Sequence, residues 1–247
     1  MIYSTLFFIF YTMKIVCLIP ARLNSKRFHG KLLKEIEGRT VIHRTYNGVK
    51  ECGGIDQLYV VTNSVEIQNH VNDFNGNVIF EDKEFKTGTD RISSVCEGLD
   101  ADYVINVQGD EPFINCNVLS KLIGEVRLGR YETYTIVNPI TDVNDITDHN
   151  TVKSIVNRKD ELIYLTRTPI KTTKPLKHIG VYAYSKEILK QIPTMGQSNL
   201  EECENIELNR LIDNGHKVKT IESDECLISI DTLEDLNKSI TILRNEQ

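Results

Sequence analysis

A short segment near the start of the chain combines an apolar strand with a cluster of cations. Residues 15–19 form a continuous apolar run, which is typical of a strand that is covered on both faces in a parallel sheet. The residues that follow contain no acid up to position 31 and include four cations, Arg22, Lys26, Arg27 and Lys31. A solvated basic loop has the same composition, but cations so close together favour an anion among them. Because open α/β sheets bind ligands at the carboxyl ends of their strands, the pattern predicts a polyphosphate site.

Three further stretches place polar residues where a helix begins or a strand ends. Residues 87–91 surround Gly88 with hydroxyl and backbone donors at a helix start, although an ordinary N-cap explains the same pattern. Residues 108–112 directly follow an apolar strand, and a carboxylate such as Asp110 can hold Mg²⁺ against phosphate oxygens at that edge. Asp231 follows another apolar run and is either a helix cap or a second metal ligand. Plain turn residues remain the alternative for residues 110 and 111.

Composition excludes several classes of protein. The chain of 247 residues has a net charge of -6 and a pI of about 5.6, which argues against a nucleic-acid partner, because such proteins need a positive surface. An apolar fraction of 40% with 26% charged residues is typical of a soluble globular protein. The six cysteines form no C-x-x-C pair, which predicts reduced thiols in a cytoplasmic protein rather than disulfides or a zinc site.

The first twelve residues are uncharged and rich in large apolar side chains. The run is too short to span a bilayer and lacks the flanking signals of a secretory leader. We expect residues 1–12 to be an extension outside the folded core, with Met13 as the natural start. A weak membrane anchor is the alternative, and no stable membrane insertion is expected.

The rest of the chain alternates strand and helix patterns. This order predicts an α/β fold with a doubly wound, mostly parallel, Rossmann-like sheet. The region 134–184 has strands with few helices between them, which predicts a smaller mixed or antiparallel part that protrudes. Without a linker, residues 13–247 form a single expected domain. The expected strands are 15–19, 57–62, 78–80, 103–107, 134–140, 152–156, 162–165, 178–184, 217–221 and 226–230, and the expected helices are 40–52, 64–71, 90–98, 115–129, 200–213 and a last one from about 233.

Eight segments also match one family in order and over nearly the whole chain. They are residues 19–22 with Arg27 and 30–31, then 87–91, 107–112, 150–153, 166–170, 177–184, 200–207 and 231–236. Together they resemble the 3-deoxy-manno-octulosonate (Kdo) cytidylyltransferases, also called CMP-Kdo synthetases. Each segment alone is weak evidence, but eight in the right order are specific.

The resemblance implies a nucleotidyltransferase that moves CMP from CTP to the anomeric hydroxyl of a 3-deoxy sugar acid, above all Kdo, and releases pyrophosphate. It implies that Arg22, Arg27 and Lys31 contact the triphosphate. Lys26 is left out, because the matching position of the family is commonly not basic. Asp110 and Asp231 would hold Mg²⁺ between the α-phosphate and the sugar acid. A homodimer is implied too, with the region 134–184 as its interface, and a product that enters lipopolysaccharide or capsule assembly in the cytoplasm.

The resemblance also supplies candidates that bind the two substrates. The hydroxyls and backbone at Thr87 and Gly88, with Arg91, would line the cytosine and ribose side. The sugar-acid candidates are Gln108, Arg167, His178, Tyr182 and Glu207. Each has a simpler alternative. His178 and Tyr182, which share a strand face, would form a pair at the edge of the core, and Glu207 would belong to a solvated acidic helix face. Arg167 would be an exposed strand end.

Departures from the family lie on the acceptor side. His29 stands where the family usually has proline, no tryptophan follows Pro169-Ile170, and Leu208-Asn209 replaces the usual Gln-Leu. CTP is therefore a firmer expectation than Kdo. The alternative acceptors are an amino-substituted octulosonate and a nine-carbon acid of the sialic-acid kind. A nucleotide-binding protein without catalysis is the alternative from another class, against which both aspartates argue. An Asp-x-Asp glycosyltransferase is disfavoured by Gln108-Gly109-Asp110.

Overall fold

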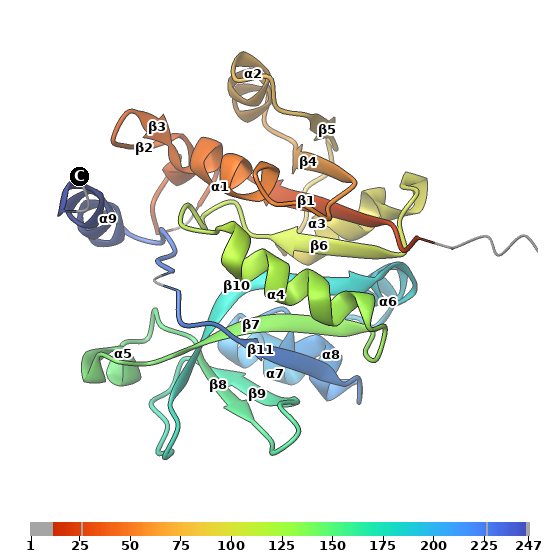
Figure 1. Cartoon of the computed structure of the whole chain (residues 1–247), viewed down its shortest axis with the longest axis vertical. Helices are drawn as coiled ribbons and strands as arrows, with labels where there is room; N and C mark the ends of the chain where they lie inside the picture. Colours follow the sequence, from red (N-terminus) through yellow and green to blue (C-terminus); the bar gives the residue numbers. More distant parts are fainter. Residues whose placement is uncertain (1–11, 26, 226, 246–247) are drawn as a thin grey trace, which may run out of the picture.

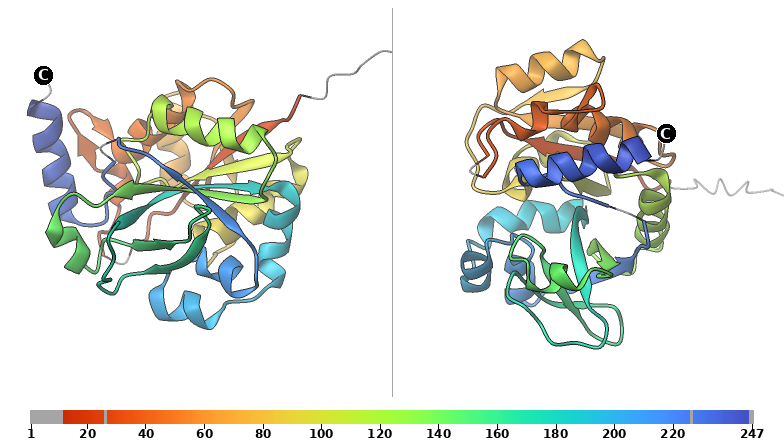
Figure 2. Two further views of the ribbon diagram at one scale, coloured as in Figure 1. Left: turned by 60° about the horizontal axis from the view of Figure 1, so that its bottom comes forward. Right: turned by 90° about the vertical axis from the view of Figure 1, so that its left-hand side faces the viewer.

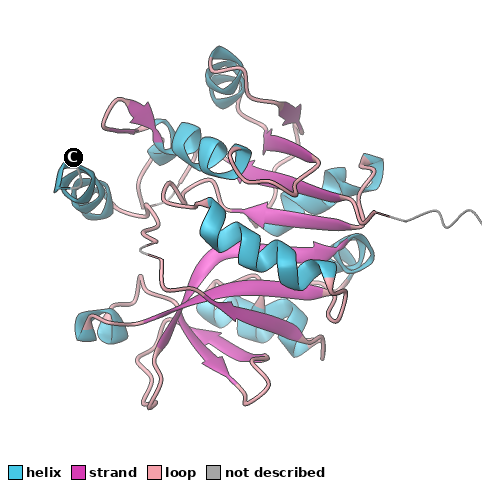
Figure 3. Cartoon of the chain, viewed as in Figure 1, coloured by secondary structure: helices cyan, strands magenta, loops and turns pink. Residues whose placement is uncertain are grey.

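The computed structural model describes residues 12–25, 27–225 and 227–245. A mixed sheet of nine strands crosses this described part, with helices on both sides of it (Figures 1 and 3). The main order is β11-β7-β10-β6-β1-β4-β5. Its strands are β1 (Ile15–Ala21), β4 (Gln57–Thr62), β5 (Val78–Phe80), β6 (Tyr103–Val107), β7 (Thr133–Pro139), β10 (Leu176–Ser185) and β11 (Val218–Glu222).

Strand direction divides the sheet into two parts. β1 pairs in parallel with β4 and β6, β4 with β5, and β11 with β7, whereas β10 runs antiparallel to both β6 and β7. The hairpin of β8 (Lys153–Val156) and β9 (Leu162–Thr166) pairs with the start of β10. The expected doubly wound, mostly parallel sheet with a smaller antiparallel part is therefore confirmed. A short pair, β2 (Glu35–Ile36) and β3 (Arg39–Thr40), stands apart.

Helices cover both faces of the sheet. Figure 1 shows α1 and α4 in front of it and α3, α6, α7 and α8 behind it, while Figure 2 shows α9 near the β2-β3 edge. The helices are α1 (Val41–Lys50), α2 (Val65–Asp73), α3 (Gly88–Val95), α4 (Cys116–Arg127), α5 (Val143–Thr147), α6 (Lys186–Gln191), α7 (Asn199–Glu204), α8 (Asn209–Asp213) and α9 (Leu233–Asn245), with 3-10 turns at Lys31–Leu33, Cys96–Gly98 and Ile192–Thr194. Side-chain caps at Thr40, Ser64 and Asn115 fix where three of them begin.

Two apolar cores lie on opposite faces of the sheet, and β1 contributes to both. Ile15, Cys17 and Ile19 belong to the core under α1 and α4, whereas Val16 and Leu18 belong to the core under α3 and α6. This alternation explains why the strand reads as a continuous apolar run, since both of its faces exclude water. The central strands are thereby held rigidly, and the loops at their carboxyl ends start from fixed positions.

Several expected elements differ from the structure. β1 continues through Pro20 to Ala21, beyond its expected end at Ile19. Its pairing with β6 stops at Leu18, so the backbone donor that Pro20 lacks is not needed by a β6 partner. The helix expected over 200–213 is two helices, because Asn205 adopts a left-handed conformation with φ 55°. Residues 227–230 form no strand, and position 226 lies outside the described residues.

Two short helices, α5 and α6, were not expected from the sequence. The extension expected over residues 1–12 lies outside the described residues except for Thr12. The five described cysteines, at positions 17, 52, 96, 116 and 203, are free thiols. Among the described helices, none is long and apolar enough to cross a membrane.

Candidate active site

Three loops meet beyond the carboxyl ends of β1 and β6. They are the basic loop after β1, the turn that follows β6, and the segment that leads into α9. The turn and the α9 segment are joined by a hydrogen bond from Ile230 N to Asp110 O of 2.9 Å. The meeting point matches the general rule that ligands bind at this edge of an open α/β sheet.

Lys31 joins the two aspartates that the sequence singles out. Its Nζ lies 2.5 Å from Asp110 Oδ2 and 2.8 Å from Asp231 Oδ1. Burial alone lowers the pKa of Lys31, but the charges of the two aspartates raise it above its ordinary value. Burial raises the pKa of Asp231, and the Lys31 charge outweighs this and lowers it. Asp231 is free for this role, because Thr232 Oγ1 accepts from Asp235 N and so caps α9.

The other cations of the basic loop divide between two places. Arg27 Nη2 lies 2.9 Å from Asp231 Oδ2, and its Nη1 donates to Asn150 Oδ1 at 2.8 Å. Arg22 is exposed at the end of β1 and contributes positive potential at Arg91. Lys26 lies outside the described residues. The structure thus brings Arg27 and Lys31 together and places Arg22 toward α3.

A second cluster surrounds Gly88 at the start of α3. A Cβ added at Gly88 would lie 2.9 Å from Gln108 Nε2 and 3.1 Å from Pro20 Cγ, so the glycine permits close packing. Glu207 Oε1 accepts from Gln108 Nε2 at 3.3 Å, and its Oε2 accepts from Thr89 N at 3.1 Å. Burial raises the pKa of Glu207. Glu207 therefore points inward and is not part of a solvated acidic face.

The start of α3 also carries two of the nucleotide candidates. Thr87 is the N-cap, and its Oγ1 accepts from Asp90 N at 3.0 Å, so the ordinary capping interpretation holds for this hydroxyl. Arg91 is buried, its Nη1 has no hydrogen-bond partner within the described residues, and its guanidinium lies 5.5 Å from the Phe85 ring centroid. A buried donor without a partner is costly, which makes Arg91 a natural contact for a ligand acceptor.

His178 and Tyr182 lie side by side on β10. Their ring centroids are 5.2 Å apart. A bulge between Ile179 and Tyr182 inserts two residues relative to β7, so the two side chains keep the same face despite the irregular register. Thr135 Oγ1 donates to Val181 O at 3.0 Å and so accepts from His178 Nε2, also at 3.0 Å. Burial, followed by the charge of Arg167, lowers the pKa of His178 to about 3, and the ring is neutral.

Arg167 lies at the end of β9 and is held mainly by backbone groups. Its Nε donates to Glu204 O at 3.1 Å, and its Nη1 donates to the carbonyls of His149 and Asn150 at 3.1 and 3.3 Å. Burial and the charge of Arg27 lower the pKa of Arg167. It is therefore not a simple exposed strand end, and Arg27 is its electrostatic neighbour.

For Glu111 the sequence offers a plain turn residue as the alternative, and the structure rules this interpretation out. Its carboxylate is buried and its Oε1 accepts from Gly180 N at 3.0 Å and from Ser229 Oγ at 2.5 Å. Burial and the neighbouring Asp110 charge raise its pKa to about 7. Through these two hydrogen bonds, Glu111 connects the β10 bulge and the segment before α9 to the turn that carries Asp110. A sequence signal for this role would be two consecutive acids, Asp110 and Glu111, in the turn that follows the buried strand β6.

The two aspartates fit a divalent cation that also binds substrate. Within residues 12–25, 27–225 and 227–245, no group of three or more His, Cys, Asp or Glu side chains can hold a metal. Asp110 and Asp231 nevertheless converge on a single point, where the Lys31 ammonium lies. Mg²⁺ is usually held by one or two carboxylates, with water and substrate phosphates completing its octahedron. The donor set therefore fits Mg²⁺ bound together with a triphosphate.

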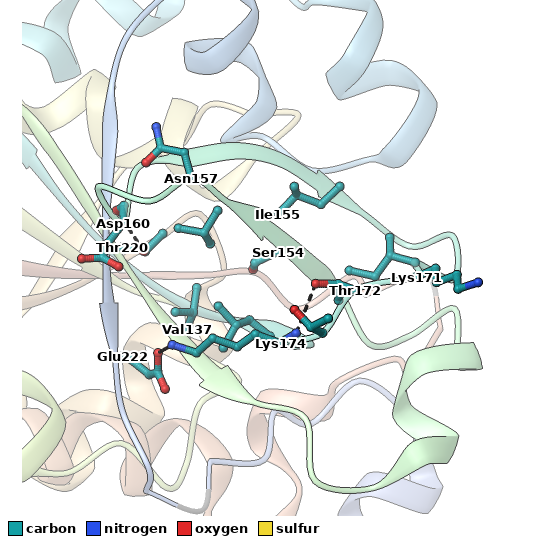
Figure 4. A pocket seen from close by; sticks show the side chains of 14 residues that line it. Val137, Ser154, Ile155, Asn157, Asp160, Lys171, Thr172, Lys174, Thr220 and Glu222 are labelled. Carbon is teal, nitrogen blue, oxygen red and sulfur yellow. Dashed lines mark hydrogen bonds and ion pairs between the residues drawn. The ribbon is translucent and has the colours of Figure 1, made fainter.

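A cavity of about 590 Å³ lies away from this site, between the β8 hairpin and β11. Figure 4 shows Ser154, Lys171, Lys174 and Thr220 around it. Lys174 pairs there with Glu222. None of the thirteen candidate site residues lines this cavity, so it does not belong to the cluster around Asp110.

Comparison with known proteins adds two kinds of relative. A family model described as Cytidylyltransferase matches residues 16–221. A 3-deoxy-manno-octulosonate cytidylyltransferase of Christiangramia forsetii is 39% identical over 240 residues, which cover 93% of this chain and 97% of the relative. Its counterpart in Fusobacterium nucleatum is 35% identical over 240 residues, with 94% and 98% covered.

Solved structures agree with the sequence matches. A CMP:2-keto-3-deoxy-manno-octonic acid synthetase complexed with CTP superposes with a TM-score of 0.86 at 30% identity and covers 95% of this chain and 100% of its own. A 4-diphosphocytidyl-2C-methyl-D-erythritol synthase of Anaerococcus prevotii has a TM-score of 0.67 at 18% identity, which shows a shared fold alone.

Proposed function

We propose, from the premise that this chain belongs to the cytidylyltransferase family, that it transfers CMP from CTP to the anomeric hydroxyl of Kdo and releases pyrophosphate. The observation that carries the proposal is the convergence of Asp110 and Asp231 on Lys31, beside Arg27 and at the carboxyl ends of β1 and β6. This arrangement offers paired carboxylates for a metal and cations for a triphosphate within one site.

The reaction asks for positioning and charge neutralisation more than for covalent chemistry by the protein. In this proposal Arg22, Arg27 and Lys31 bind the triphosphate, and Lys31 exchanges its aspartate partners for phosphate oxygens. Asp110 and Asp231 would hold Mg²⁺. The bound ion would supply Lewis-acid chemistry that lowers the pKa of the attacking hydroxyl and offsets charge on the α-phosphate.

On the nucleotide side, the start of α3 would receive the cytosine and ribose. The absence of a side chain at Gly88 lets the start of α3 pack closely against Gln108, and the Nη1 of Arg91, which has no partner within the described residues, supplies a donor. Thr87 is occupied as the N-cap of α3, so its contribution would be to fix the backbone that faces the ligand.

On the acceptor side, the proposed contacts come from four different elements. Arg167 would pair with the sugar-acid carboxylate, because a guanidinium fork matches a carboxylate in two hydrogen bonds. The neutral ring of His178, the hydroxyl of Tyr182, the amide of Gln108 and the carboxylate of Glu207 would then bind hydroxyls of the sugar. The half-buried position of Glu207 and the close approach of the His178 and Tyr182 rings support this grouping.

The same acceptor side favours a second candidate acceptor. Leu208-Asn209 follow Glu207 here, and Asn209 hydrogen-bonds the backbone of β9 at Leu165 rather than facing a ligand. The missing tryptophan after Ile170 therefore remains the departure that keeps an amino-substituted octulosonate or a nine-carbon acid as the alternative acceptor. The nucleotide side is common to both proposals.

We propose further that the protein is a cytoplasmic homodimer that joins through the region 134–184, with Mg²⁺ as its metal and a product for lipopolysaccharide or capsule assembly. The resemblance to the Kdo cytidylyltransferases, which implies a dimer through this region, supports the proposal. Light scattering of the purified chain checks the proposal, since a mass near 28 kDa rather than twice that value contradicts the dimer.

The test of the activity is pyrophosphate release from CTP in the presence of Mg²⁺ and a panel of sugar acids. Release with Kdo supports the proposal. Release only with an amino-substituted octulosonate or a nine-carbon acid moves the acceptor while keeping the enzyme class. Absence of release with every acceptor contradicts the enzyme.

A further inference from the structure

We propose that Asn150 is a positioning residue that holds the guanidinium of Arg27 in the site, and that the buried Lys153 fixes the turn from which Asn150 reaches it. This role rests on the proposed function, in which Arg27 contacts the triphosphate of CTP. Residues 150–153 are one of the eight segments noted in the sequence, and none of them is itself a proposed metal ligand or substrate contact.

Arg27 has two anchors on opposite sides of its guanidinium. Nη2 pairs with Asp231 at 2.9 Å, and Nη1 donates to Asn150 Oδ1 at 2.8 Å. The side chain remains 44% exposed, and an exposed ion pair alone holds a long side chain poorly, because rotamer entropy and screening oppose it. The second anchor fixes the plane of the fork, on which bidentate recognition of phosphate depends.

The turn that carries Asn150 is pinned from inside. Lys153 is fully buried, and its Nζ donates to three backbone carbonyls, those of Asp148 at 2.8 Å, Thr151 at 2.9 Å and Arg167 at 2.7 Å. An ammonium has three donors, so its hydrogen-bonding capacity is filled by the backbone. If the ammonium lost any of these three carbonyls, one of its buried N–H donors would have no partner, which is costly. Lys153 therefore holds the chain in place on both sides of it.

The pinned turn serves both substrate sides. Arg167 Nη1 donates to the carbonyls of His149 and Asn150, so its position depends on the same turn through the backbone. Arg27 depends on the turn through the Asn150 side chain. Replacing Asn150 by alanine removes only the contact with Arg27, whereas replacing Lys153 loosens the supports of Arg27 and Arg167 together.

Steady-state kinetics with CTP and Kdo separate these two effects. Asn150→Ala is expected to lower kcat/KM for CTP about tenfold and to leave KM for Kdo within about twofold. Asn150→Asp keeps the acceptor oxygen and is expected to restore most of the loss. Lys153→Met is expected to raise KM for both substrates. Asn144→Ala, the same change at an exposed position of α5, is the matched control and is expected to behave as the wild type.

A double-mutant cycle tests whether Asn150 acts through Arg27. In an Arg27→Ala background, Asn150→Ala is expected to change kcat/KM by less than about twofold, because its partner is already gone. If the losses in kcat/KM caused by Arg27→Ala and Asn150→Ala multiply in the double variant, the proposal is overturned. An Asn150→Ala enzyme with wild-type kinetics overturns it as well. Both variants change exposed side chains, so the result does not depend on the folding of Lys153→Met.

Calorimetric measurement of CTP binding in the presence of Mg²⁺ tests the role of Asn150 without any acceptor sugar. If the wild type cytidylylates no sugar acid, the proposed function fails, and a CTP affinity about tenfold weaker in Asn150→Ala still supports the positioning role. Equal CTP affinities of the wild type and Asn150→Ala overturn it, and a wild type that does not bind CTP overturns both proposals.

Discussion

Lys31 and Asp231 are 200 positions apart in the sequence, yet Lys31 Nζ lies 2.8 Å from Asp231 Oδ1. The same ammonium reaches Asp110, so one cation holds together a loop after β1, a turn after β6 and the segment that precedes α9. Two carboxylates that face one point repel each other unless a cation lies between them. In the proposed function, Asp110 and Asp231 would hold Mg²⁺ here.

Lys31→Met should make the stability of the protein depend on the metal. Without the ammonium, we expect a loss of about 2 kcal/mol in the presence of a chelator, because the partly buried Asp110 loses its cation and Asp231 keeps only Arg27. Mg²⁺ should restore more stability in this variant than it adds to the wild type. Thermal unfolding followed by circular dichroism, with and without Mg²⁺, measures both effects.

Lys34→Met is the matched control, since it removes an exposed lysine just beyond the same 3-10 turn. Its melting temperature should respond to Mg²⁺ as the wild type does. A Lys31→Met protein that shows no larger response than this control would mean that the two aspartates do not form a cation site.

Gly88→Ala should impair catalysis through Gln108. The new Cβ would lie within 3.1 Å of both polar atoms of the Gln108 amide, which must then move away from Glu207. We expect kcat/KM to fall about tenfold or more, because displacement of an ordered side chain disturbs the binding geometry. Gly98→Ala is the control, since its added Cβ meets nothing within 4 Å. Equal activity of the two variants would contradict the assigned role of this packing.

His178 should make the protein less stable as the pH falls. Its pKa is lowered from 6.5 to about 3 in the folded chain, so only the unfolded chain takes up the proton as the pH falls through 6.5. Stability is therefore lost between pH 6.5 and about 3. In His178→Gln we expect the loss between about pH 7 and pH 5 to be smaller by about 1 kcal/mol, a value reduced for the partial exposure of the ring.

Urea unfolding at the two pH values measures this difference. The hydrogen bond to Thr135 can be kept by the glutamine amide, so the comparison isolates the titration of the ring. Identical pH dependence of the free energy of unfolding in the wild type and the variant would show that His178 is not held neutral.

Much of the fold follows from local patterns. The strands expected at 57–62, 78–80 and 103–107 match β4, β5 and β6 residue by residue, because short apolar runs between turn signals leave little freedom. The break at Asn205 was missed, since helical periodicity continues across it and only the left-handed backbone shows the interruption. The run at 227–230 is apolar because Leu227 and Ile230 fill the core, not because it pairs with another strand.

The site was only partly accessible from the sequence. Residue types and the order of segments indicated Lys31, Asp110 and Asp231, but their separation in the chain carries no information about distance. Glu111 was missed because an acid in a turn usually faces water, whereas here the β10 bulge turns Gly180 N toward it. Long-range relations of this kind arise from the topology, which brings the loops after β1 and β6 to one edge.

The transfer of CMP itself is tested most directly by ³¹P NMR of the purified chain with CTP, Kdo and Mg²⁺. We predict that the triphosphate signals disappear while a phosphodiester signal of CMP-Kdo and a pyrophosphate signal grow together. A chelator should stop the reaction, and Asp110→Ala should abolish it while the variant keeps the circular dichroism spectrum of the wild type. Unchanged CTP signals with Kdo and every alternative sugar acid, or a fully active Asp110→Ala, would contradict the account.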